Sequence, residues 1–159
     1  GFDLLVDAFI DLARRPGFED VILKSGGWLS EKDRAYHERQ LAKLEETGLH
    51  RRHHPVGSPD GEGKIAFFRD VDVFSVPARF VEPKGIERTA ASGGGRLVPH
   101  GDAKALADEL ASLLENAEAR QRIGAAGRDW VRRECGREAM ARTTAAVFSH
   151  FLDLPHLLG

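Results

Sequence analysis

Residues 64–86 read KIAFFRDVDVFSVPARFVEPKGI, and this stretch decides which fold the sequence predicts. Its first six residues have enough apolar surface for a short helix that lies on a sheet. Residues 71–76 form a nearly continuous β-branched and aromatic run, which is typical of a strand covered on both faces in a parallel sheet. Pro77 lacks a backbone donor and is expected to end that strand.

The loop after this predicted strand holds Glu82, Pro83, Lys84 and Gly85. In open α/β sheets, ligands bind beyond the carboxyl ends of the strands. The polar, glycine-containing loop therefore lies where such a fold carries its chemistry.

The flanking sequence alternates between helical and strand patterns. Asp3, Ser30 and Asp102 are expected to cap helices. Helices are expected at about 3–15, 31–47, 102–116, around 123–131 and at 137–152, and strands at 21–25, 52–56 and 96–98. Such alternation indicates βαβ units, hence an α/β fold with a Rossmann-like parallel sheet flanked by helices.

Composition narrows the class of protein. The chain has 159 residues, of which 42% are hydrophobic and 30% charged, a balance that suits one soluble domain. A formal net charge of -2 argues against a nucleic-acid partner. No apolar run is long enough for a membrane span. The single Cys135 excludes an internal disulfide and favours a reducing, cytoplasmic location.

At residues 64–86 the sequence resembles the donor-binding segment of group 1, family-4-like glycosyltransferases of the GT-B type, which pair two Rossmann-like domains around a nucleotide-sugar. The resemblance extends over most of the chain. It implies that residues 1–159 are a single C-terminal glycosyltransferase-type domain, an incomplete C-terminal half of a GT-B fold. The implied reaction is retaining transfer of a sugar from a nucleotide-diphosphate sugar to an acceptor.

The resemblance also implies a set of site residues. Ser25 and Gly26, at the end of a predicted strand, match the family strand whose following glycine lines the base pocket. Glu82 matches a catalytic glutamate near the donor sugar hydroxyls. The segment Lys84-Gly85-Ile86 matches backbone amides that approach the sugar and phosphates.

Two departures from the family pattern bear on activity. The basic residues that hold the donor diphosphate would precede Gly1. In addition, Ile86 joins Glu87 directly, where the family has a helix bearing a second glutamate, then a strand. We therefore expect a missing segment between residues 86 and 87, no transferase activity from the chain alone, and exposed sheet edges.

The implied partners are a nucleotide-sugar donor, a sugar or lipid acceptor, and an N-terminal domain, with homo-oligomers formed through the exposed edges. No cofactor and no metal are expected beyond this substrate. His53 and His54 are adjacent on a predicted strand, so their side chains should point to opposite faces rather than share a metal.

Other readings of the sequence stay open at this stage. The chain could be a non-catalytic remnant that acts as a protein-interaction module through its sheet edges. A flavodoxin-like receiver would need an acidic cluster at the ends of its strands where ligands bind. Asp70 and Asp72 instead lie at the start of the strand predicted at 71–76. We expect Trp28 to anchor a loop, Trp130 and the helical phenylalanines to be core residues, and Arg51 and Arg52 to be solvated.

Overall fold

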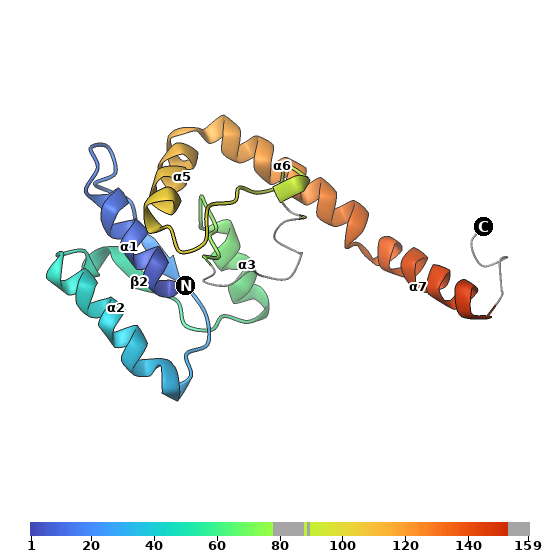
Figure 1. The fold of residues 1–159 in the computed structure, drawn as a ribbon, viewed down its shortest axis with the longest axis horizontal. Coiled ribbons are helices and arrows are strands. Elements are labelled where there is room, and N and C mark those ends of the chain that lie inside the picture. The colour runs from blue at the N-terminus through green and yellow to red at the C-terminus, as the bar shows by residue number, and fades with distance from the viewer. Residues whose placement is uncertain (78–87, 89, 153–159) are drawn as a thin grey trace. The chain divides into compact units, whose positions relative to one another are not determined.

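The computed structural model describes residues 1–77, 88 and 90–152. Its elements in chain order are α1 (Phe2–Ala13), β1 (Leu23–Ser25), a short 3-10 turn (Glu31–Asp33), α2 (Arg34–Glu46), a second such turn (His50–Arg52), β2 (His53–Pro55), α3 (Gly61–Arg69), α5 (Ala103–Glu115), α6 (Ala117–Glu134) and α7 (Arg137–Leu152). Figure 1 draws these elements along the chain. The chain divides into two compact units, one of residues 1–82 and 98–120, the other of residues 83–97 and 121–159.

The first unit has an α/β core, as the sequence predicts. β1 and β2 pair in parallel, with Leu23 opposite His53 and Ser25 opposite Pro55. Leu23 is buried, and it packs with apolar residues of α1 and α2 in a cluster of Val6, Phe9, Leu23, Leu44 and Leu49. The described residues thus form a small parallel sheet flanked by helices, which is consistent with part of a Rossmann-like fold.

Helix α1 is central to the first unit. Its apolar residues recur at helical spacing and give it an apolar surface that packs against its neighbours. One side packs against the sheet, and another meets α5, where Ala8 is buried beside Leu106 and Ala107. Further along, Leu12 packs with Phe18 and Ala111. Figure 1 shows α5 and α2 beside α1.

The predicted helix caps are confirmed only in part. The Asp102 carboxylate accepts a hydrogen bond of 2.8 Å from the Ala105 amide and caps α5. Asp3 does not cap α1: it lies inside the helix, and its side chain accepts a hydrogen bond from the Tyr36 hydroxyl (2.8 Å). Ser30 precedes the first turn of its helix, but its hydroxyl donates to the Asp33 carboxylate and not to the backbone.

The strand prediction for residues 71–76 is wrong. Residues 71–77 are all described, and they form no strand; Phe74 and Val76 are exposed by 55% and 60%. Residues 96–98 are likewise not a strand. A strand is stable only when a neighbour satisfies its backbone groups, and in the described part of the chain β1 and β2 pair only with each other.

The second unit contains the greater part of α6, and α7. Two of its glycines lie close together, since a Cβ on Gly94 would come within 2.5 Å of the Gly127 Cα atom. Several large apolar side chains of its helices are exposed, namely Val131, Met140, Val147 and Phe148. Among the described residues, no helix is both long and apolar enough to span a membrane.

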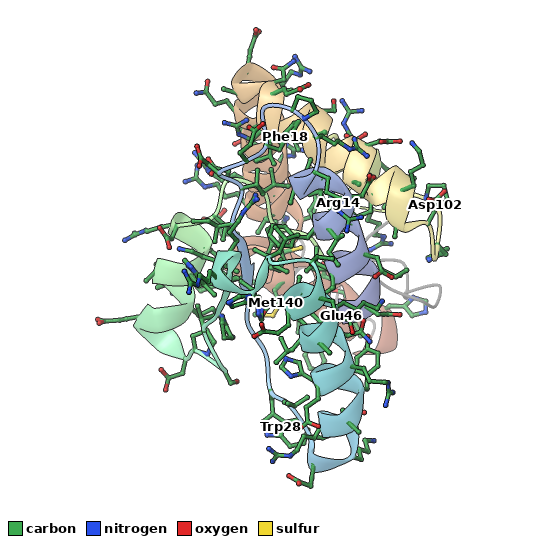
Figure 2. All side chains as sticks on the ribbon, turned by 90° about the vertical axis from the view of Figure 1, so that its left-hand side faces the viewer. Arg14, Phe18, Trp28, Glu46, Asp102 and Met140 are labelled. Carbon is green, nitrogen blue, oxygen red and sulfur yellow. The ribbon has the colours of Figure 1, made fainter. Side chains whose placement is uncertain are left out.

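Three expectations about individual side chains are wrong or are confirmed only in part. Trp28 is 80% exposed and therefore does not anchor its loop; Figure 2 shows it on the loop before α2. Among the helical phenylalanines Phe9 is buried as predicted, but Phe68 and Phe148 are about half exposed. Trp130 is only partly buried. Arg52 is not simply solvated, because its guanidinium donates to the carbonyls of Val21 and Phe18, both at 2.8 Å, and lies over the Phe9 ring.

Candidate functional site

The carboxyl ends of β1 and β2 form the candidate site in the first unit. Two backbone hydrogen bonds continue the pairing past the strands: the Val56 amide donates to the Ser25 carbonyl at 2.8 Å, and the Gly27 amide donates to the Gly57 carbonyl at 2.7 Å. The two loops therefore leave the sheet side by side at the edge where parallel α/β folds bind ligands.

Gly26 lies where these loops approach each other most closely. A Cβ on this residue would meet Val56 Cγ2 at 3.0 Å and the Gly57 carbonyl oxygen at 3.6 Å. Only a residue without a side chain leaves that approach undisturbed. The neighbour of Gly26 in this structure is thus the β2 loop.

Ser25 is held by a histidine from the other strand. Its Oγ lies 2.7 Å from Nε2 of His53, which is a buried residue at the start of β2. Both side chains are on the same face of the sheet as Leu23, because Leu23 pairs with His53 and side chains two residues apart share a face. This is the face that α1 and α2 cover.

One aromatic side chain, Phe2, lies beside the His53 ring. Phe2, in the first turn of α1, stacks on His37 of α2 at 5.2 Å between ring centroids, and it lies 5.9 Å from His53. Burial and the neighbouring His37 and His54 lower the pKa of His53. The ring is therefore mainly neutral near pH 7, with one N–H and one lone pair.

The other face of the sheet carries Lys24, which forms an ion pair with Asp70 at the end of α3. A groove of about 610 Å³ opens here. It is lined by residues of β1, the β2 loop and α3, among them Lys24, Val56, Phe67 and Arg69. Ser25 is separated from this groove by the sheet itself, since adjacent strand residues point to opposite faces.

The remaining predicted site residues lie outside the described residues. These are Glu82, Lys84, Gly85 and Ile86, together with the Ile86–Glu87 junction. The structure therefore places Ser25 and Gly26 at one sheet edge.

Sequence reasoning overlooked the link between His53 and Ser25. The period of two along the strand predicted that His53 and His54 face opposite ways, and this is confirmed: His53 is buried and His54 is exposed. The same period places Ser25 and His53 on one face once the register is known, but the register is not written in either strand alone. Among the described residues, no three His, Cys, Asp or Glu side chains gather as metal ligands.

Comparison with known proteins gives one informative match. The chain is 35% identical over 99 residues to a phosphatidyl-myo-inositol mannosyltransferase of Mycobacterium leprae (strain TN), a match that covers 49% of this chain and 26% of that protein. The chain thus spans about a quarter of the length of this relative. No protein-family model matches, and no solved structure matches significantly. The similarity supports a relationship to glycosyltransferases.

Proposed function

We propose that this chain is the C-terminal donor-binding domain of a GT-B, family-4-like glycosyltransferase. The parent enzyme transfers a sugar from a nucleotide-diphosphate sugar to a sugar or lipid acceptor, with retention of configuration. The observation that carries the proposal is the similarity to a mannosyltransferase. The parallel strands that end at Ser25 and Pro55 support it, because they offer the sheet edge at which such folds bind nucleotides.

In this proposal the donor lies across the loops after β1 and β2. Ser25 and Gly26 border the base. Glu82 receives the sugar hydroxyls, and the amides of Lys84, Gly85 and Ile86 face the sugar and phosphates, where charge develops on the departing diphosphate. An N-terminal domain supplies the acceptor site. Beyond the donor and the acceptor, the proposed reaction requires no cofactor and no metal.

Titration calorimetry of the 159-residue chain tests donor binding. We expect saturable binding of a nucleoside diphosphate, either UDP or GDP, and of the matching nucleotide-sugar. Glu82→Gln should weaken the nucleotide-sugar about tenfold and leave the nucleoside diphosphate unchanged, since Glu82 contacts only the sugar. Glu62→Gln, on an exposed residue of α3, is the control and should change neither. If Glu82→Gln weakened the affinity for the nucleoside diphosphate as much as that for the nucleotide-sugar, the role given to Glu82 would be contradicted.

We also propose that the chain alone is inactive, because the segment expected between residues 86 and 87 and the acceptor domain both contribute to turnover. A transfer assay with several nucleotide-sugars should therefore show no product. Peptide mapping shows whether Ile86 is joined directly to Glu87. If it is, trypsin should release the peptide Gly85-Ile86-Glu87-Arg88. Turnover by a chain that yields this peptide would overturn the proposed inactivity.

A second candidate function is protein interaction through exposed apolar segments. The observation in its favour is the aromatic cluster of Phe67, Phe68 and Phe74. Phe68 and Phe74 are about half exposed, and Phe74 belongs to residues 71–77, which pair with no strand. Light scattering coupled to size-exclusion chromatography distinguishes it. A stable monomer at high concentration contradicts homo-oligomerisation, and a dimer that Phe74→Ser dissociates supports it.

A cytoplasmic location is proposed from the free, exposed thiol of Cys135.

A further inference from the structure

The imidazole of His53 is buried, yet its Nε2 atom has one side-chain partner, the Ser25 hydroxyl at 2.7 Å. The hydroxyl belongs to the last residue of β1, at the ligand-binding edge of the sheet. A serine hydroxyl rotates freely about its C–O bond and can either donate or accept. A fixed neighbour is therefore needed if this hydroxyl is to present one orientation to a ligand.

His53 is held by its strand and by an aromatic neighbour. Its backbone belongs to β2, which is paired with β1. The Phe2 ring of α1 lies against it, and that ring in turn stacks on His37 of α2. The imidazole thus has little freedom to move, and its Nε2 atom is held at one place above Ser25.

We propose that His53 is a positioning residue for the nucleotide: its Nε2 atom determines the direction in which the Ser25 hydroxyl presents its hydrogen and its lone pairs to the ligand. This inference rests on the proposed function, which places Ser25 at the base of the donor. When Nε2 accepts, the hydroxyl offers lone pairs to the ligand; when Nε2 donates, the hydroxyl offers its hydrogen. In either case the ligand meets one defined partner, at no cost for orienting it upon binding.

Two amides of similar polarity separate positioning from mere packing. In His53→Gln the side-chain amide reaches the place of Nε2, whereas in His53→Asn the amide reaches only the place of Nδ1 and cannot contact Ser25. Both variants remove the aromatic ring and any charge. A purely structural role would therefore be disturbed by both in the same way.

The experiment is calorimetric titration of the full 159-residue chain with UDP and with GDP. We expect His53→Gln to keep the dissociation constant within about threefold, and His53→Asn to raise it about tenfold, the amount of one hydrogen bond. Ser25→Ala should raise it by the same factor, and the double variant Ser25→Ala with His53→Asn should be no weaker than Ser25→Ala alone.

Additive losses in the double variant, or equal losses for the two amides, would overturn the inference. So would unchanged binding in both His53→Asn and Ser25→Ala, which would leave the proposed function standing. If the wild-type chain bound no nucleoside diphosphate, the proposed function would fail first and the inference with it.

A second measurement covers the case in which His53→Asn does not fold. Nitrogen-detected NMR of the histidine rings reports the protonation of Nε2 and Nδ1 in the wild-type chain and in Ser25→Ala. We expect the His53 Nε2 signal to shift on Ser25→Ala and, in the wild type, on addition of UDP or GDP. If the His53 Nε2 signal did not shift on addition of the nucleotide, although Ser25→Ala weakened nucleotide binding, the positioning role would be contradicted.

Discussion

Gly94 and Gly124 of the second unit have opposite surroundings. A Cβ on Gly94 would lie 2.5 Å from the Gly127 Cα atom, whereas nothing lies within 4 Å of a Cβ on Gly124 in α6. We predict that Gly94→Ala destabilises the protein by about 1–3 kcal/mol through overpacking. Gly124→Ala should stabilise it by about 0.5–1 kcal/mol, because alanine favours the helix.

Urea unfolding followed by circular dichroism measures both changes, with Gly124→Ala as the matched control. A Gly94→Ala variant as stable as Gly124→Ala would contradict the close contact between Gly94 and Gly127.

His53 predicts how the free energy of unfolding depends on pH. Burial lowers the pKa of His53 in the folded protein below its unfolded value of about 6.5. The unfolded chain therefore binds the proton more readily, so this residue's contribution is present above pH 6.5 and is lost as the pH falls toward the folded pKa. The wild type should lose more stability than His53→Gln between pH 7.5 and pH 5.5.

Chemical denaturation at the two pH values checks this difference. Because His37 and the other histidines remain in His53→Gln, the comparison isolates the one ring. Parallel pH profiles for the two proteins would show that His53 is not buried as described.

At the scale of elements, the helices and both strands of the described sheet were predictable, but the strands predicted at 71–76 and 96–98 do not form. The periodic apolar residues of α1 and α5, and the Asp102 cap, are local signals that a helix satisfies by itself. A strand depends on a neighbour that the sequence does not specify. Residues 71–76 have the composition of a buried strand, and in the described part of the chain they have no strand beside them.

Two phenylalanines test this description of the elements. Phe9 of α1 is 3% exposed, while Phe74 in the unpaired segment is 55% exposed. We predict that Phe9→Ala costs about 3–5 kcal/mol of folding free energy. Phe74→Ala should cost less than about 1 kcal/mol, since little of its surface is buried.

Thermal and urea unfolding of the two variants provide the measurement, with light scattering to detect any change of association. A large loss of stability from Phe74→Ala in a monomeric protein would mean that residues 71–76 pack into the core after all.

At the scale of the whole molecule, the fold class and the place of Ser25 and Gly26 within it followed from the sequence. Ser25 and Gly26 lie at the carboxyl edge of a parallel pair, as the alternation of strands and helices predicts. The partner of Ser25 did not follow, because His53 is 28 residues away and only the strand register brings the two together. The groove beside Lys24 depends in the same way on where α3 packs.

We propose that the loops after β1 and β2, with the loop of Glu82, bind the donor. This proposal is tested most directly by backbone amide NMR of the labelled chain during titration with UDP, GDP and their sugar derivatives. We predict saturable shifts at Ser25, Gly26 and His53 for the nucleoside diphosphates. The sugar derivatives should add shifts at Glu82 and at 84–86. Shifts confined to other parts of the chain, or no shifts at any concentration, would contradict donor binding at these loops.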